Sequence, residues 1–498
     1  MTAFVLVSGP FTGAWVWRET AERLRAAGAE VRPVALTGMP DGPAGGPETG
    51  LGTHVADVLR AVDACAAPEV VLVGHDYGIH PVLGAADRRP GRVARVVYLD
   101  AGMPGDGDAA LALTPAGTRA RDGFVAPPQG VEWGRWGSLE GLSPEVLDLL
   151  DRRAAPQPER TLTEPLRLAG SPFDRPTTGV LCTAGGAGIA MVELLVATGP
   201  PEYRALASPR VGFLELPTGH WPMLSAPEAL AGALLGAAAD EGHRVAPPRP
   251  EAAGPGAADA APGTFLLDVP ERPRERRGRV DLHLPEAEGP RPAVLLVHGG
   301  PVSPEQRPTP RDSATLLGYA RYLAGLGVVG ATVDHRLHGL EDYPRAAADV
   351  AAAVELVRAD PRVDGDRVAL WFLSAGGLLS ADWLAAPPLW LRAVALSYPV
   401  LAPPPSWRAV DPAFRPVAAV GAASPPLVLI RAGREHKVFA TAVEAFLAAA
   451  GKAGAEVEVI DAPLARHAFE TLDHTPDTRA AVVRAARAVV DGLLRAEG

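Results

Sequence analysis

The chain has 498 residues, 47% of them hydrophobic and 21% charged, with a formal net charge of −11 at pH 7. This length exceeds what one hydrophobic core usually organises, so two domains of roughly 240 residues each are expected. An acidic balance with no basic stripe argues against nucleic acid and anionic membranes as partners. No run approaches 18 apolar residues, so no membrane span is expected.

The N-terminal run Met-Thr-Ala-Phe-Val-Leu-Val-Ser-Gly has no basic segment before its apolar residues. It therefore predicts a strand rather than a secretion signal. Cys65 and Cys182 lie in apolar stretches, a pattern that fits a reducing cytoplasm and no disulfide framework. Nothing in the sequence indicates a cofactor or a metal, and a homo-oligomer stays open.

The first domain is expected over residues 1–240. Short β-branched or apolar runs alternate there with amphipathic helix patterns, which predicts a mostly parallel sheet covered on both faces. The interval of about 105–175 has poor strand character and many Pro and Arg residues. The expected strands are 4–8, 31–36, 70–74, 95–99, 179–183 and 211–216, and the expected helices are about 17–27, 53–66, 79–88 and 227–239.

Residues 241–263 are rich in Pro, Ala and Gly and lack large apolar side chains, so they predict an extended linker. The second domain, 264–498, repeats the order of elements of the first, which indicates a duplicated fold. No cap-sized insertion is evident in it. The expected strands are 265–269, 279–284, 293–297, 328–333, 368–372, 393–397, 427–431 and 456–460.

Two turns carry the strongest functional signal. Gly74-His75-Asp76-Tyr77-Gly78 and Phe372-Leu373-Ser374-Ala375-Gly376 each follow a strand and open a helix. Each resembles the nucleophile elbow of the α/β-hydrolase fold, so the fold class is predicted to be two tandem α/β-hydrolase domains. A carboxylate attacks saturated carbon, whereas a serine attacks carbonyl groups.

In the second domain, Ser374 is followed by Glu435 after one strand and by His467 after the next. Nucleophile, acid and histidine is the chain order of α/β-hydrolases. His467 would take the serine proton, and Glu435 would orient the imidazole and stabilise its charged form. Residues 264–498 thus resemble dienelactone hydrolases, esterases and acyl-peptidase-like serine hydrolases.

The same resemblance implies an oxyanion site. The run His298-Gly299-Gly300-Pro301 is similar to the family's oxyanion loop, whose backbone N–H groups would act with that of Ala375. One residue departs from the family pattern: Phe372 stands two positions before the serine, where glycine is usual. A crowded, inactive elbow is the alternative interpretation.

The first domain resembles capped small esterases, in which the interval 105–175 would be the cap. Aspartate at the elbow is typical of epoxide hydrolases and haloalkane dehalogenases, which form an ester on the carboxylate. His220, in the turn after the last strand, is the expected base. The loop after strand 179–183 offers no carboxylate before Glu193, so Asp100, after the strand that follows the elbow, is predicted as the acid.

The oxyanion loop of the first domain reads Ser8-Gly9-Pro10-Phe11, and proline has no N–H to donate. The remaining backbone donors would be those of Tyr77 and Phe11. The cap contains no tyrosine of the kind that epoxide hydrolases use. Its Trp133 and Trp136 could donate indole N–H bonds to a developing alkoxide or a halide, or could simply pack the cap.

The sequence leaves three functional hypotheses open. The protein is a bifunctional hydrolase of small, secondary-metabolite-like molecules, with epoxide-hydrolase-like or dehalogenase-like chemistry at Asp76 and ester or lactone cleavage at Ser374. Alternatively, the first domain is a degenerate binding or docking module attached to one serine esterase. In the third hypothesis, Asp76 and His220 catalyse a non-hydrolytic elimination or cyclisation.

Overall fold

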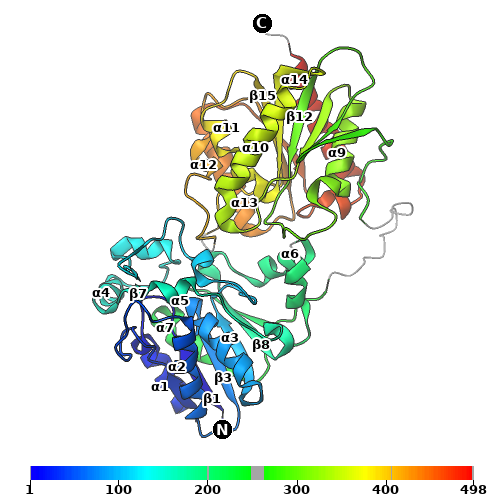
Figure 1. Cartoon of the computed structure of the whole chain (residues 1–498). Coiled ribbons are helices and arrows are strands. Elements are labelled where there is room, and N and C mark those ends of the chain that lie inside the picture. The colour runs from blue at the N-terminus through cyan, green and yellow to red at the C-terminus, as the bar shows by residue number, and fades with distance from the viewer. Residues whose placement is uncertain (1, 199–200, 248–262, 405–406, 496–498) are drawn as a thin grey trace. The chain divides into compact units, whose positions relative to one another are not determined.

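A computed structural model describes residues 2–198, 201–247, 263–404 and 407–495. These residues form two compact units, whose elements Figure 1 labels. Unit 1 comprises Met1–Ala197, Glu202–Pro247 and the short segment Pro404–Ala409, and unit 2 comprises the rest of the chain. Of the expected linker 241–263, residues 248–262 lie outside the described part. The first linker residues pack on unit 1, where His243 pairs with Phe213 of the last strand.

Unit 1 contains a parallel six-stranded sheet in the order β2-β1-β3-β4-β8-β9. Each strand coincides with a predicted one to within three residues at either end. The strands β1 and β3 are buried along their whole length, and β4 and β8 at all but one position, which is why they appear in the sequence as apolar runs without alternation. The strands are β1 Ala3–Val7, β2 Glu30–Pro33, β3 Val70–His75, β4 Val93–Leu99, β8 Thr177–Cys182 and β9 Val211–Leu216.

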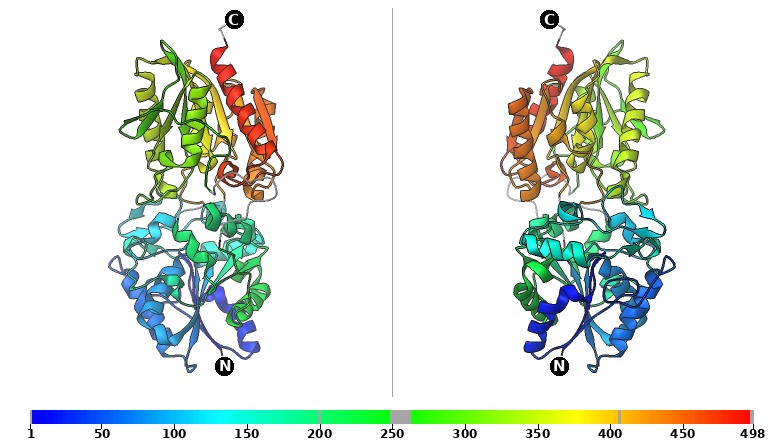
Figure 2. Two further views of the ribbon diagram at one scale, coloured as in Figure 1. Left: turned by 90° about the vertical axis from the view of Figure 1, so that its right-hand side faces the viewer. Right: turned by 90° about the vertical axis from the view of Figure 1, so that its left-hand side faces the viewer.

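Helices flank this sheet on both sides (Figure 2). The helix α1 packs against α8, and α2 packs against α3, so each face of the sheet has its own layer. The four predicted helices of this domain are all present. The helices are α1 Arg18–Ala26, α2 Leu51–Asp63, α3 Ile79–Arg88, α6 Ile189–Thr198, α7 Pro222–Ser225 and α8 Pro227–Ala238.

The segment between β4 and β8 contains no long strand. It holds a small antiparallel sheet of three two-residue strands, β5 Ala120–Arg121, β6 Phe124–Val125 and β7 Gln157–Pro158. Two helices, α4 Pro144–Arg153 and α5 Glu159–Thr163, accompany it with several 3₁₀ turns. The high proline content of this interval accounts for the short elements, because proline cannot donate a backbone hydrogen bond.

Unit 2 contains a mixed eight-stranded sheet in the order β10-β11-β13-β12-β14-β15-β16-β17. Its first two pairings are antiparallel and the other five are parallel. The strands are β10 Arg274–Arg277, β11 Val280–His283, β12 Arg291–Val297, β13 Val329–Val333, β14 Val363–Leu373, β15 Leu391–Ser397, β16 Leu427–Ala432 and β17 Val457–Ala462.

The expected strand 265–269 was wrong. Its apolar residues pack on a helix instead: the Phe265 ring lies 5.2 Å from that of Tyr319 and covers Gly318. The edge strand is the charged β10, in which Arg276 pairs with Asp281 of the neighbouring strand. An edge strand held by ion pairs carries no hydrophobic pattern, so no periodic signal marks it in the sequence.

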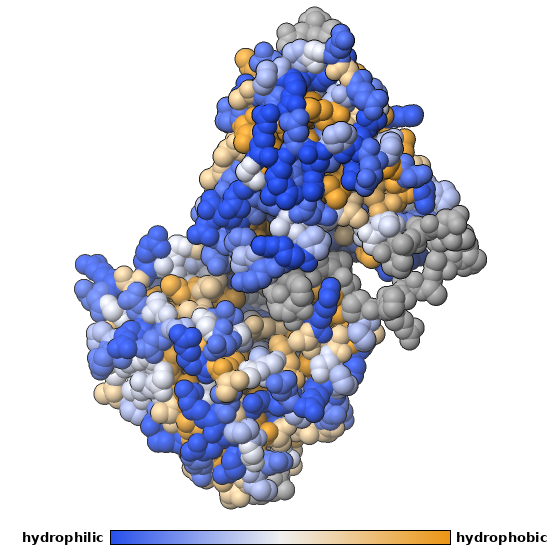
Figure 3. All heavy atoms as spheres, turned by 45° about the vertical axis from the view of Figure 1, so that its right-hand side comes forward, coloured by the Kyte–Doolittle hydropathy of each residue, from blue (hydrophilic) through white to orange (hydrophobic). Residues whose placement is uncertain are grey.

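The helices of unit 2 cover both faces of its sheet (Figures 1 and 2). No helix in the described part of the chain is long and apolar enough to cross a membrane. On the face that Figure 3 shows, hydrophilic and hydrophobic residues are interspersed, as is usual for a surface that faces water. The helices are α9 Ala314–Gly325, α10 Tyr343–Arg358, α11 Ala381–Ala385, α12 Pro416–Ala419, α13 Lys437–Ala453 and α14 Pro476–Leu494.

The turn after β3 depends on Gly74. A Cβ atom at this position would lie 2.5 Å from the Cα of Ile79, at the start of α3. We expect Gly74→Ala to lower the stability of unit 1 by about 1–3 kcal/mol, because the helix start must move away. Calorimetry should report a midpoint several degrees lower. The matched control is Gly52→Ala in α2, where a new Cβ meets nothing within 4 Å and no loss is expected; equal midpoints for the two variants would contradict the packing argument.

Candidate active sites

Both elbow residues have a backbone conformation that is costly for any residue except glycine. The φ angle is 48° at Asp76 and 52° at Ser374. Asp76 follows β3 directly, and Ser374 follows β14 directly. Non-glycine residues at positive φ are uncommon and are held by their surroundings, often at functional sites. The two turns therefore present different side chains from one type of strained backbone.

The elbows differ in the length of the turn that comes after each of them. In unit 1, a three-residue 3₁₀ turn, Asp76–Gly78, leads at once into α3, whose close approach requires Gly74. In unit 2, where Phe372 occupies the corresponding position, the 3₁₀ segment extends over Ser374–Ser380 before α11 begins. Phe372 is fully buried, and Ser374 Oγ lies 2.6 Å from His467 Nε2.

In unit 2, hydrogen bonds connect three predicted residues in a row. Ser374 Oγ lies 2.6 Å from His467 Nε2, and His467 Nδ1 lies 2.7 Å from Glu435 Oε2. The Nδ1 atom must donate, because a carboxylate only accepts. In a neutral imidazole, Nε2 is then an acceptor for the Ser374 hydroxyl, which is the arrangement of a general base before proton transfer.

The residues predicted to hold an oxyanion in unit 2 flank the serine. A Cβ atom on Gly299 would lie 2.9 Å from the Cβ of Ser374, so the loop backbone passes directly against this residue. Gly300 follows and packs against Leu337, while Ala375 is the residue after the serine. Only glycine permits this approach at position 299. Backbone of two segments, the Gly299 loop and the turn after the serine, therefore lies next to Ser374.

In unit 1, His220 lies between two carboxylates. Its Nδ1 atom is 2.6 Å from Asp100 Oδ2, and its Nε2 atom is 2.9 Å from Asp76 Oδ2. Both nitrogens must donate, so the ring is a positively charged imidazolium. Burial alone would lower the pKa of His220, but the bonds to Asp100 and Asp76 raise it above its usual value. The predicted trio is brought together, in a different protonation state from that of unit 2.

A fourth residue, Arg408, completes this cluster. It lies on Pro404–Ala409, which belongs to unit 1 although it falls between β15 and β16 in the chain. Its Nη1 donates to Asp76 Oδ2 at 2.8 Å and its Nη2 donates to Asp76 Oδ1 at 3.0 Å. Burial would raise the pKa of Asp76, but Arg408 and His220 together hold it well below its usual value. No local pattern distinguishes this arginine in the sequence.

Two predicted donors of unit 1 are engaged elsewhere. The Phe11 N–H donates to Gln157 Oε1 at 3.2 Å, and the Trp133 indole N–H donates to Asp151 Oδ1 at 2.8 Å. Both partners lie in the interval 105–175, so these groups fasten that interval rather than serve a substrate. Trp136 packs edge-on against Phe11, with ring centroids 4.7 Å apart, and its carbonyl oxygen accepts from Arg408.

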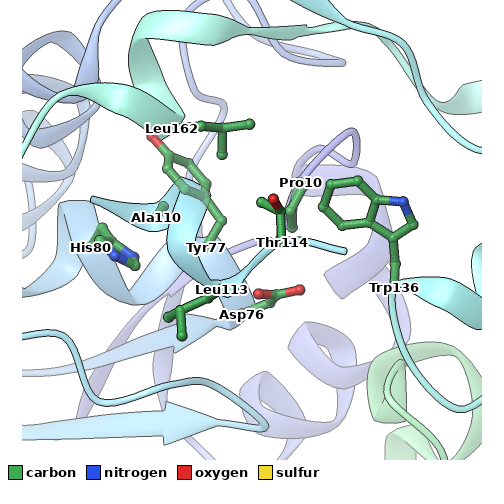
Figure 4. A pocket seen from close by; sticks show the side chains of 9 residues that line it. All are labelled: Pro10, Asp76, Tyr77, His80, Ala110, Leu113, Thr114, Trp136 and Leu162. Atoms are coloured by element: carbon green, nitrogen blue, oxygen red, sulfur yellow. The ribbon is translucent and has the colours of Figure 1, made fainter. Parts of the chain in front are cut away.

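A small pocket lies beside Asp76 (Figure 4). Its walls are mostly apolar, and the Tyr77 hydroxyl is 2.7 Å from His54 Nδ1 and so is not free. His80 is buried, and neither ring nitrogen has a hydrogen-bond partner among the described residues. Burial lowers the pKa of His80 to about 4, so this ring is neutral. The lining residues are Pro10, Asp76, Tyr77, His80, Ala110, Leu113, Thr114, Trp136 and Leu162.

A parallel sheet flanked by helices, with a strained turn that presents a side chain to a histidine, defines the α/β-hydrolase class. The family model described as "Alpha/beta hydrolase family" matches residues 4–233. A relative described as "Carbendazim hydrolyzing esterase", from Nocardioides sp. (strain SG-4G), is 32% identical over 249 residues, which is 46% of this chain and 97% of the relative. The chain belongs to the alpha/beta hydrolase family and is a hydrolase.

Further matches are shorter or more distant. "Esterase PIR7B" from Oryza sativa subsp. japonica is 38% identical over 104 residues, which is 20% of this chain and 39% of that protein. An extracellular α/β-hydrolase from a Paenibacillus species is 19% identical, with a TM-score of 0.39, and the match covers 48% of this chain and 99% of that protein's chain.

Within the described residues, no group of three or more His, Cys, Asp or Glu is arranged to hold a metal ion.

The Asp76–Arg408 ion pair leads to a prediction about the stability of unit 1. Both side chains are about nine-tenths buried, so removal of either partner leaves an unpaired buried charge. We expect Asp76→Asn and Arg408→Ala each to destabilise unit 1 by about 3–5 kcal/mol. The double variant should lose clearly less than the sum of the two, because it leaves no unpaired charge.

The control is Arg153→Ala, whose pair with Asp41 is about 40% exposed on both sides. An exposed pair of this kind contributes at most about 1 kcal/mol. Thermal unfolding midpoints of the four variants and the parent measure the comparison. Additive losses in the double variant would show that Arg408 and Asp76 do not depend on each other.

Proposed function

We propose that the protein is an esterase of small organic molecules, that unit 2 is a second α/β-hydrolase domain, and that its nucleophile is Ser374. The observation that carries this proposal is the continuous hydrogen-bond sequence from Ser374 through His467 to Glu435. In chain order, Ser374 follows β14, Glu435 follows β16 and His467 follows β17, which is the order of the family. The edge strands β10 and β11 are additions to that core.

The geometry accounts for each step of acyl transfer. His467 Nε2 takes the proton as Ser374 Oγ attacks the ester carbonyl, and Glu435 stabilises the imidazolium that results. Backbone N–H groups at Ala375 and in the Gly299–Gly300 loop, which lies against Ser374, would be the donors to the developing oxyanion. The imidazolium then gives its proton to the leaving alkoxide, and a water molecule repeats the sequence to release the acid.

Removal of the nucleophile tests this function. We expect the protein to hydrolyse p-nitrophenyl acetate and to bind a fluorophosphonate covalently at Ser374, detected by intact-mass spectrometry. Ser374→Ala should lose both, with kcat/KM reduced about 10³-fold or more. The control Ser303→Ala, whose hydroxyl donates to Glu305, should match the parent. Absence of labelling in a folded parent protein would remove Ser374 from the mechanism.

A second reaction is proposed for unit 1, with residues 105–175 as its cap. The arrangement of Asp76, His220 and Asp100 favours covalent attack on an epoxide-like or halogenated carbon. Among the described residues, Asp76 Oδ1 accepts a hydrogen bond from Arg408 alone, so it keeps a lone pair for attack. The C–O bond to Oδ1 forms, the ring C–O bond breaks, and the His220 imidazolium donates its proton to the departing alkoxide.

The same geometry serves the second half of this reaction. Once Asp76 is an ester it carries no charge, so the neutral His220 can activate a water molecule against the Asp76 carbonyl. The oxygen that becomes negative is Oδ2, which already faces Arg408 Nη1 at 2.8 Å. Arg408 therefore supplies the oxyanion donor that Pro10 cannot supply. The walls of the pocket in Figure 4 are mostly apolar, which favours a small organic substrate such as a secondary metabolite.

The ion pair also supports a non-hydrolytic alternative. An Asp76 carboxylate neutralised by Arg408 is a weak nucleophile, and in that state unit 1 serves as a binding module and transforms no substrate. In a further alternative, Asp76 and His220 act only as proton carriers in an elimination or cyclisation. These alternatives differ from covalent attack in where the product oxygen originates.

An isotope experiment separates them. We expect a single turnover of styrene oxide in ¹⁸O-water to give unlabelled diol and one ¹⁸O atom in Asp76, because the product takes the original Oδ1. Asp76→Asn should abolish the reaction, while Asp122→Asn, on an aspartate that is almost fully exposed, should not change it. Label in the diol at the first turnover would indicate direct attack by water. A folded enzyme that never reacts with the epoxide would favour the binding role.

A further inference from the structure

A fully buried carboxyl group lies behind the catalytic histidine of unit 2. Glu470 follows His467 by three residues and has no exposed surface. The Tyr319 hydroxyl, from α9, donates to its Oε1 atom at 2.8 Å. The other oxygen, Oε2, is buried with no hydrogen-bond partner among the described residues. The acyl-transfer mechanism uses neither oxygen, so the presence of this costly group needs another explanation.

The groups around Glu470 connect it with the histidine. The Tyr398 ring, directly after β15, lies edge-on against His467 with centroids 4.8 Å apart, and against Phe469 at 5.7 Å. The Tyr398 phenol interacts electrostatically with the Glu470 carboxyl. His467 therefore has one carboxylate bonded at Nδ1, that of Glu435, and a second carboxyl group behind its neighbouring ring.

The titratable groups that act on Glu470 come from three elements. They are Tyr319 on α9, Tyr398 after β15 and His467 in its own loop, and Glu435 in turn acts on Tyr398. Burial raises the pKa values of Tyr319 and Tyr398 well above the usual value, so both phenols stay neutral. Burial also raises the pKa of Glu470 to about 7, against the opposing effect of Tyr319. The Glu470 carboxyl therefore changes charge in the pH range in which an esterase works, whereas the two phenols do not.

We propose that Glu470 is a positioning residue for His467: its carboxyl holds the Tyr398 ring against the imidazole, and its charge state alters the proton affinity of that imidazole. The inference rests on the proposed esterase function of Ser374. A negative charge behind the ring favours the protonated imidazole, which cannot accept the Ser374 proton. Ionisation of Glu470 therefore delays the appearance of the active, neutral histidine as the pH rises.

The test compares kcat/KM for p-nitrophenyl acetate from pH 5 to 9 in the parent, Glu470→Gln and Tyr319→Phe. An uncharged glutamine should move the midpoint of the rise in kcat/KM to lower pH by roughly half a unit or more. Tyr319→Phe removes a donor to the carboxylate, keeps Glu470 protonated to higher pH and should shift the midpoint in the same direction. The control Glu456→Gln, on a carboxyl that is 69% exposed, should leave the profile unchanged.

A stability measurement tests the charge state of the same carboxyl independently of enzyme activity. Since its pKa in the folded chain lies above the unfolded value of 4.5, the stability that Glu470 contributes is fully present below about pH 4.5 and is lost as the pH rises through about 7. Glu470→Gln should remove this part of the pH dependence of the unfolding midpoint. Glu456→Gln should retain it.

The outcomes are distinct. Fluorophosphonate labelling of Ser374 in the parent and in Glu470→Gln, with a shifted profile, supports the role. Labelling with superimposable profiles overturns it and leaves the esterase function intact. If Glu470→Gln does not fold, an unshifted Tyr319→Phe profile overturns it. A parent that is not labelled at Ser374 overturns the esterase function and, with it, this inference.

Discussion

An imidazole bonded at both nitrogens takes its charge from its two partners, and this constraint separates the two sites. His467 donates to Glu435 through Nδ1 and faces the Ser374 hydroxyl through Nε2, so only one of its two nitrogens has a carboxylate partner. His220 faces a carboxylate at each nitrogen, so both nitrogens donate and the ring is charged. A change from hydroxyl to carboxylate at the elbow therefore raises the number of carboxylates bonded to the histidine from one to two.

The charge of His220 explains the rest of its surroundings. Two buried carboxylates and one imidazolium carry a net negative charge, which is unfavourable in a water-poor site. Arg408 brings the sum of Asp76, Asp100, His220 and Arg408 to zero, and it does so with a planar donor pair that matches the carboxylate. His467 of unit 2, which bonds a single carboxylate, has no comparable requirement. Near His467, burial of Glu470 instead favours the protonated form of that carboxyl.

Much of the fold could be predicted because its strands are buried on both faces and appear as apolar runs between turn residues. The elbow residues and their partners could be placed by chain order. The contribution of Arg408 could not be predicted, because 332 positions separate it from Asp76 and no motif marks it. The partners of Phe11 and Trp133, Gln157 and Asp151, could not be predicted because they lie in a segment without periodic signal. The charged edge strand β10 was missed for the same reason.

The two units also use two places for the acid. Asp100 directly follows β4, the strand after the elbow, with φ of 42°, whereas Tyr398 occupies that place after β15 with φ of 36°. Both residues have the same left-handed turn, and both side chains touch the histidine of their unit, one by a hydrogen bond and one by a ring contact. In unit 2 the carboxylate comes from Glu435, after the next strand. Parallel strands end at one edge of the sheet, so the histidine loop lies within reach of either strand end, and the sequence is free to place its acid at one and an aromatic ring at the other.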